Sequence, residues 1–258
     1  MRHSTGYIFL FAGAICIICA IVVCLSEVSL SALHENNARF DKQKNVLYAA
    51  GLARPGENLS SEDVRLRFER VRAIAIHVED GEPAPGIDPD LYDARKAAVD
   101  PKAGRSAPPN ASAIKRMARH AVIYHILENS GEVGMIVLPI EGYGLWGTLY
   151  GFLALDADAK TVLGLTYYQH KETPGLGGEV DNPDWKALWP GRVAFDGGGE
   201  VAIEVIKGHA GPPVNDPHRV DGLSGATITS RGVTNMLHFW LGENGFGPYL
   251  KKFRGDQS

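Results

Sequence analysis

The sequence predicts an α+β protein, with a largely antiparallel sheet, flanking helices and one N-terminal transmembrane helix. Residues 7–25 carry no charge, and nineteen uncharged residues are about the length that crosses the apolar core of a bilayer as a helix. In the rest of the chain, strand patterns outnumber helical ones and follow one another in hairpin-like pairs. Consecutive antiparallel strands with helices beside them are typical of the α+β class.

The uncharged run is expected to remain as a membrane anchor, because the apolar segment of a cleaved signal peptide is shorter, at about 7–15 residues. A cleaved signal peptide stays as the alternative, since Ser29-Leu30-Ser31 is a passable cleavage site. A lipoprotein signal fits poorly, because two valines precede Cys24 where a small residue is needed. Basic residues on both sides of the run leave the membrane orientation open.

The composition argues against several classes of function. The chain holds 30 acidic and 26 basic residues without a long basic run, so nucleic acid is not expected as a partner. Its three cysteines all lie within the apolar run, so the remainder can form no disulfide, thiolate metal site or iron–sulfur cluster of its own. The nine histidines show no metal-ligand spacing, and no Ser/His/Asp arrangement stands out. No metal site and no catalytic acid–base pair are therefore predicted.

Three regions are expected: an anchor over residues 1–33, a helical and irregular lead-in region over 34–118, and a more regular domain over 119–258. The elements expected in the lead-in region are a polar continuation of the helix over 34–50 that ends at Gly51, a helix that starts after Ser60, a strand over 73–79, and a proline-rich surface excursion over 80–112 with a short helix near 92–98. The elements expected in the last region are strands over 120–127, 133–140, 148–155 and 161–170, a short helix near 185–188, strands near 192–195 and 201–206, and a helix from about 230 to 242.

One segment is a candidate site: residues 221–230, with the sequence DGLSGATITS directly before a helical pattern. Backbone N–H groups are free at a helix N-terminus and the helix dipole is positive there, so such a turn suits a phosphate group. Thr227 is one candidate contact, and the small Gly225 and Ala226 before it leave its hydroxyl accessible. The other candidate contacts in the segment are Ser224, Gly225 and Ala226. The simpler interpretation is a capped helix, with Thr229 or Ser230 as its N-cap.

Two more glycine-rich segments and one lysine are candidate ligand contacts. In residues 170–179, HKETPGLGGE, three glycines and a proline fix a loop whose backbone can approach a ligand closely. Residues 143–147, YGLWG, combine aromatic side chains with glycines, which suits a flat apolar ring. The simpler interpretations are a glycine-rich connector, core aromatics and a solvated lysine. The candidate residues are Thr173, Gly175, Leu176 and Gly177 in the first segment, Tyr143, Gly144, Leu145 and Trp146 in the second, and Lys207.

Taken together, these segments resemble the C-subunit family of the sodium-translocating NADH:quinone oxidoreductase (the Nqr complex) and, more broadly, the FMN-binding domain family. The resemblance runs almost from end to end. The segments that carry it are the N-terminal span, DKQKNVL at 41–47, GLWG at 144–147, HKETPGLGG at 170–178, WKALW at 185–189, SGATITS at 224–230 and FWLGENGFGPYL at 239–250. The proline-rich stretch over 80–109 has no counterpart that the resemblance identifies.

The resemblance implies that Thr227 carries FMN covalently, through a phosphoester that a flavin transferase makes. It implies a single-pass protein of the bacterial inner membrane with its soluble domain on the periplasmic side. Its partners would be the A, B, D, E and F subunits of Nqr, which together form a sodium-translocating NADH:ubiquinone reductase. The chain would relay electrons from a metal cofactor held by the D and E subunits to the FMN of the B subunit. It would itself bind neither NADH nor quinone and would hold no complete active site.

Two other functions stay open. The G subunit of the related Rnf electron-transport complex shares the SGAT and HKETPGLG segments, although residues 184–191 and 239–250 favour the C subunit of Nqr. The second alternative is a membrane-anchored extracytoplasmic binding or assembly module without a redox group.

Overall fold

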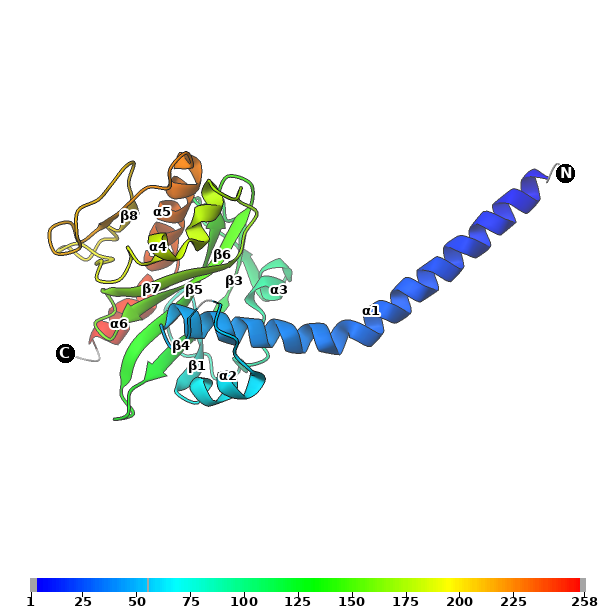
Figure 1. Ribbon diagram of the computed structural model, residues 1–258. Helices are drawn as coiled ribbons and strands as arrows, with labels where there is room; N and C mark the ends of the chain where they lie inside the picture. The colour runs from blue at the N-terminus through cyan, green and yellow to red at the C-terminus, as the bar shows by residue number, and fades with distance from the viewer. Residues whose placement is uncertain (1–3, 55, 256–258) are drawn as a thin grey trace. The chain divides into compact units, whose positions relative to one another are not determined.

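The computed structural model describes residues 4–54 and 56–255 (Figure 1). The chain divides into two compact units, residues 1–43 and 44–258. The first unit holds most of helix α1 (Thr5–Ala49), whose segment Thr5–Ser26 has a mean hydropathy of 3.1 and is long enough to cross a membrane. One apolar helix near the N-terminus fits the expected single-pass anchor. The helix ends as expected just before Gly51, whose φ of +67° is the left-handed conformation common after helices.

The second unit is built on a five-stranded sheet with the order β1-β4-β5-β6-β7, in which every neighbouring pair is antiparallel. The strands are β1 (Val71–His77), β4 (His120–Leu127), β5 (Val133–Tyr143), β6 (Thr148–Asp156) and β7 (Val162–Gln169). The predicted α+β class with a largely antiparallel sheet is confirmed.

Each strand divides its side chains between two apolar cores, one on each face of the sheet. In β5, Ile136, Leu138 and Ile140 join the first core, whereas Met135 and Val137 join the second. This alternation follows from the two-residue period of a strand. Burying one such side chain fully stabilises the fold by about 1.5–3 kcal/mol.

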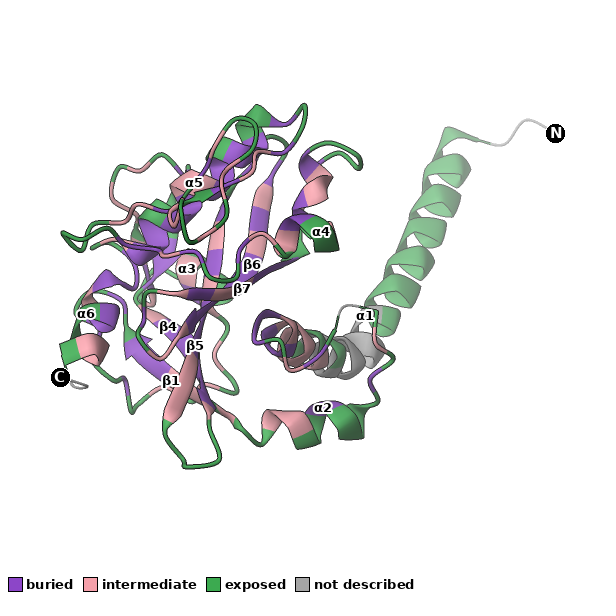
Figure 2. Cartoon of the chain, turned by 60° about the vertical axis from the view of Figure 1, so that its left-hand side comes forward, coloured by how far each residue is buried: buried purple, intermediate pink, exposed green. Residues whose placement is uncertain are grey.

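Helices cover both faces of the sheet. Helix α5 (Thr227–Leu241) contributes Val233, Met236 and Leu237 to the first core. The last residues of α1, which belong to the second unit, contribute Val46 to the second core. Figure 2 shows the buried colour running along the inner strands and along α5. The start of α5 is thereby fixed at the end of the sheet where β5 turns into β6.

Shorter elements complete the second unit. Helix α2 (Ser61–Phe68) starts with a capping box, in which the Ser60 hydroxyl accepts from the Asp63 N–H and the Asp63 carboxylate accepts from the Ser60 N–H. The remaining elements are α3 (Ala94–Val99), β2 (Gly104–Ser106), β3 (Arg116–Ala118), the 3₁₀ helix η1 (Gly177–Asp181), α4 (Pro183–Lys186), β8 (Glu204–Val205), β9 (Arg219–Val220) and α6 (Gly247–Gly255).

The strand expected near 192–195 is wrong, and the one expected near 201–206 is present only as the short β8 (Glu204–Val205). Over residues 192–206 the structure has isolated bridges and the two-residue β8. The physical reason is the buried Arg192, whose guanidinium donates to the carbonyl oxygens of Leu188, Gly211 and Asp216. The segment is thus fixed by hydrogen bonds from one side chain, whereas a strand would be fixed by backbone hydrogen bonds to a neighbouring strand.

Two further differences concern elements that were not expected. The proline-rich stretch contains β2, which pairs with β3, so this stretch is less irregular than expected. Helix α6 follows α5 after a short turn and begins at Gly247-Pro248, since proline is tolerated in the first turn of a helix. Strand β1 lies in the expected lead-in region yet pairs with β4, and the three-part division of the chain stays a prediction.

A buried histidine makes the stability of this unit depend on pH. His125 of β4 is buried, and its Nε2 lies 2.5 Å from the Tyr249 hydroxyl of α6. Burial, with repulsion from Arg72, lowers the pKa of His125 to about 4. A histidine in the unfolded chain titrates at about pH 6.5, so the unfolded state takes up a proton first as the pH falls. The stability that neutral His125 contributes is therefore present above about pH 6.5 and lost between that pH and about pH 4.

We expect a fall from about pH 7.5 to about pH 5.5 to lower the free energy of unfolding by roughly 1–1.5 kcal/mol through this residue. Urea unfolding at the two pH values measures the change. His125→Gln, which has no titrating group and can still bond to Tyr249, should lose this part of the pH dependence. An equal pH dependence in the two proteins would contradict the assignment.

Candidate functional site

The candidate segments meet around one buried carboxylate, that of Glu172, which lies three residues after the end of β7 and is 5% exposed. Its Oε1 accepts from the backbone N–H of Leu145 at 3.0 Å and of Trp146 at 2.9 Å. Its Oε2 accepts from the Thr229 hydroxyl at 2.5 Å, and Leu145 N–H also reaches it at 3.2 Å. One side chain thus joins the β5–β6 loop, the segment after β7 and the first turn of α5.

Two glycines lie against this carboxylate because no side chain would fit. A Cβ on Gly144 would come within 2.6 Å of Glu172 Oε1. A Cβ on Gly177 would come within 2.7 Å of Glu172 Oε2 and 2.5 Å of Thr229 Oγ1. Glycine is therefore needed at both positions so that the two candidate loops can pack closely around Glu172. The interpretation as a simple glycine-rich connector does not explain this packing.

Helix α5 begins at Thr227, three residues earlier than expected, and no side chain caps it. The expected caps are wrong, since Thr229 and Ser230 lie inside the first turn and are buried. Thr229 donates to Glu172, and the Ser230 hydroxyl accepts from the Leu223 N–H at 3.1 Å. Both hydroxyls are taken up by tertiary bonds, which leaves the N–H groups at the helix start without a side-chain partner.

Thr227 is exposed at the first position of this helix. Gly225 precedes it with a φ of +69°, and a Cβ there would lie 2.8 Å from Leu176 Cδ2. The turn before Thr227 therefore packs against the loop that follows β7. A hydroxyl presented at an uncapped helix N-terminus is a suitable place for a phosphate group.

Exposed apolar side chains lie on the same segments that Glu172 joins, and we call them the apolar rim. The rim consists of Tyr143 (46% exposed), Leu145 (40%), Trp146 (62%), Leu176 (44%) and Ile228 (54%). Tyr143 and Trp146 are thus not core aromatics. Ile228 was not predicted as a site residue, although its place next to Thr227 and outside the apolar face of the helix could have indicated it.

The remaining predicted contacts lie on the same loops. The carbonyl oxygen of Thr173 accepts from the N–H groups of Leu176 and Gly178, which closes a tight turn at Gly175. Lys207 is exposed in the loop after β8, next to Gly208, whose carbonyl oxygen accepts from Gly222 N–H at 2.9 Å. The structure therefore brings Lys207 close to the beginning of residues 221–230, which we call the hydroxyl-rich segment.

Hydrogen bonds and an ion pair that involve His170, Asp181 and Lys186 fix the loop after β7. Asp181 accepts from His170 Nε2 at 2.7 Å and forms an ion pair with Lys186 at 3.1 Å. His170 Nδ1 accepts from the Glu172 N–H at 3.2 Å, which assigns the proton to Nε2. This chain of bonds holds the backbone of Glu172 and so the place of its carboxylate.

The hydroxyl-rich segment is anchored at its other end by Asp221. The Asp221 carbonyl oxygen accepts from Trp185 Nε1 at 2.9 Å. Burial acts to raise the pKa of the Asp221 carboxyl, but hydrogen bonds from His209 and the Ala210 N–H outweigh it and lower the pKa below its ordinary value. The segment thus leaves its anchored start at Asp221 and runs to the exposed Thr227.

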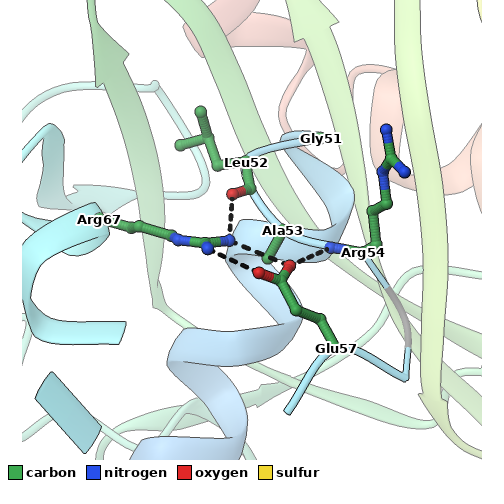
Figure 3. Close-up of a pocket in the computed structure, with 6 residues that line it drawn as sticks. All are labelled: Gly51, Leu52, Ala53, Arg54, Glu57 and Arg67. Carbon is green, nitrogen blue, oxygen red and sulfur yellow. Dashed lines mark hydrogen bonds and ion pairs between the residues drawn. The ribbon is translucent and has the colours of Figure 1, made fainter. Parts of the chain in front are cut away.

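A hollow of about 570 Å³ lies elsewhere, where α1 ends and α2 approaches (Figure 3). Its lining includes Arg67, which forms an ion pair with Glu57 at 2.6 Å and also donates to the Leu52 carbonyl oxygen. Because Arg67 is already paired, the hollow offers no free cation from this residue. None of the predicted site residues lines it.

Comparison with known proteins supports the same segments. Residues 144–242 match the model of the FMN-binding domain family. The chain is 43% identical over 257 residues to the C subunit of Na(+)-translocating NADH-quinone reductase from Pseudomonas aeruginosa, covering 98% of this chain and 97% of that protein. It is 43% identical over 256 residues to the corresponding protein of Yersinia pestis, covering 98% and 94%. The crystal structure of Shewanella oneidensis NqrC is similar, with a TM-score of 0.78 and 32% identity over 84% of this chain and 98% of that one.

Proposed function

Because this chain belongs to the NqrC family, the C subunits of Na(+)-translocating NADH-quinone reductase, we propose that it relays electrons within that complex through FMN held covalently on Thr227. The match to the FMN-binding domain supports FMN as the cofactor. The main observation in support of Thr227 as the attachment residue is its position: it is exposed at the first residue of a helix that no side chain caps.

The surroundings of Thr227 fit a phosphoester. The hydroxyl oxygen would bond to the flavin-side phosphorus of a donor in which FMN is joined to a second phosphate by a phosphoanhydride. That phosphoanhydride bond breaks, the second phosphate leaves with the rest of the donor, and the hydroxyl proton passes to solvent. A flavin transferase would catalyse this step, and the small Gly225 and Ala226 leave it room. The phosphate would then lie at the uncapped start of α5, where the helix dipole favours an anion. Ser224, three residues before Thr227, and Lys207, whose neighbour Gly208 bonds to Gly222, are both exposed and would supply a hydroxyl and a cation.

The apolar rim fits the flavin ring. Leu145, Trp146 and Leu176 offer apolar surface for a flat ring and exclude water from part of it, and Tyr143 adds an aromatic face. The turn at Thr173, Gly175 and Gly177 lets the backbone approach the ring closely. FMN, when bound, supplies one-electron oxidation and reduction chemistry. The protein positions it and leaves part of the rim open to a partner.

The partners in this proposal are the A, B, D, E and F subunits of the same complex. Electrons would arrive from a metal cofactor held by the D and E subunits and leave to the FMN of the B subunit. The nearly full-length identity of 43% to an NqrC protein supports this family over the G subunit of Rnf.

The direct test is fluorescence of the denatured protein. The full chain is co-expressed with a flavin transferase, separated on an SDS gel and viewed under ultraviolet light. We expect a yellow-green band at the position of this chain, because only a covalently bound flavin survives SDS. No band in the presence of an active transferase would overturn the proposal and favour a binding module without a redox group.

We also propose that the second unit lies on the periplasmic side of the inner membrane. The helix Thr5–Ser26 would span the membrane once. Protease added to spheroplasts is then expected to digest residues 44–258, while a cytoplasmic marker protein stays intact. Protection of the chain until the spheroplasts are lysed would reverse this orientation.

A further inference from the structure

Glu172 is a buried negative charge close to the proposed flavin site, and the FMN proposal gives it no role. The carboxylate is 5% exposed and lies behind the backbone of Leu145 and Trp146, whose side chains form part of the apolar rim. Within the described part of the chain, no lysine, arginine or histidine forms an ion pair with it. The charge is therefore neither screened by water nor neutralised by a cation.

The donors around Glu172 are suited to an ionised carboxylate. Oε1 faces two backbone N–H groups, and Oε2 faces a hydroxyl and one of the same N–H groups. A backbone N–H can only donate, so Oε1 can only accept. Hydrogen bonds of this kind stabilise the negative charge in a buried place where bulk solvent cannot.

We propose, on the basis of the FMN site described above, that Glu172 is a positioning residue whose negative charge sets the reduction potential of the bound flavin. Reduction places additional negative charge on the flavin. A fixed anion behind the apolar rim opposes that charge, and the interaction is strong because little water lies between them. Glu172 therefore lowers the reduction potential and favours the onward transfer of electrons. Its hydrogen bonds at the same time fix the loop and helix that hold the flavin.

Glu172→Gln separates the charge from the hydrogen bonds. The Gln amide oxygen can still accept from Leu145 and Trp146, and its NH₂ group can donate to Thr229, whose hydroxyl then acts as the acceptor. The matched control is Glu200→Gln, which removes the same charge from an exposed loop. Solvent screens an exposed charge, so this control should not change the potential.

The experiment is a redox titration of the flavin absorbance in the full chain, loaded by co-expression with a flavin transferase. We expect Glu172→Gln to shift the midpoint potential upward and Glu200→Gln to leave it at the wild-type value. The thermal melting temperature of unloaded Glu172→Gln should stay close to that of the unloaded wild type. A loaded Glu172→Gln protein that titrates at the wild-type potential would overturn the inference.

A second variant decides the case in which Glu172→Gln binds no flavin. Thr229→Val keeps the charge of Glu172 and the backbone donors but removes one hydroxyl that stabilises the charge. We expect its midpoint potential to fall below the wild-type value, and an unchanged or raised potential would contradict the role of the charge. A wild-type chain without covalent flavin is a different result, which overturns the FMN proposal itself.

Discussion

Thr227→Val is expected to carry no covalently bound flavin. Valine has nearly the shape of threonine but replaces the hydroxyl with a methyl group, so it has no oxygen that could form a phosphoester. Thr227 is exposed at the first residue of α5, and its hydroxyl makes none of the hydrogen bonds found among the described residues. The fold should therefore tolerate the change, while the fluorescent band on an SDS gel disappears completely.

Ser224→Ala is the comparison that identifies the attached hydroxyl. Ser224 is also exposed and lies three residues before Thr227 in the same segment. If the ester is on Thr227, the band persists in Ser224→Ala and the mass of the intact protein still includes one FMN. A fluorescent band in Thr227→Val, or its loss in Ser224→Ala alone, would place the attachment elsewhere.

The sheet could be predicted because its signals are local. Residues 120–127 and 133–140 are short apolar runs that contain several β-branched side chains, and the turn between them contains Gly131, which has a φ of +87°. The segment over 192–206 could not be predicted in the same way. Its conformation depends on Arg192, which reaches carbonyl oxygens 19 and 24 residues away.

In the candidate site, too, the features that depend on local sequence could be predicted and those that depend on distant contacts could not. A run of glycines and hydroxyls before a helical pattern indicates a phosphate turn, and the family resemblance of this segment then singled out Thr227 among its hydroxyls. Glu172 could not, because its partners lie 26, 27 and 57 residues away and two of them are backbone N–H groups that any residue carries. The start of α5 was misplaced for a related reason, since the hydroxyls of Thr229 and Ser230 bond to distant groups rather than cap the helix.

Helix α5 is held against the β5–β6 loop by a glycine in its second turn. A Cβ on Gly232 would lie 2.5 Å from the carbonyl oxygen of Tyr143 and 3.1 Å from Gly144 Cα. Both are backbone atoms, one at the end of β5 and one in the loop that Glu172 binds, so they cannot move as a flexible side chain would. The contact sets how closely the start of α5, and with it Thr227, approaches the apolar rim.

Gly232→Val is therefore expected to destabilise the protein by about 3 kcal/mol, even though intrinsic helix propensity alone favours valine over glycine by a few tenths of a kcal/mol. The added side chain must push α5 away from the loop, which also weakens the bond between Thr229 and Glu172. Urea unfolding measures the stability, and the SDS-gel fluorescence of the co-expressed protein should fall in parallel. Gly86→Val, at a glycine with open space around it, is the matched control and should change neither quantity much. If Gly232→Val were as stable as the wild type, the close approach of α5 would not position Thr227, and the flavin site would depend on the Glu172 bonds alone.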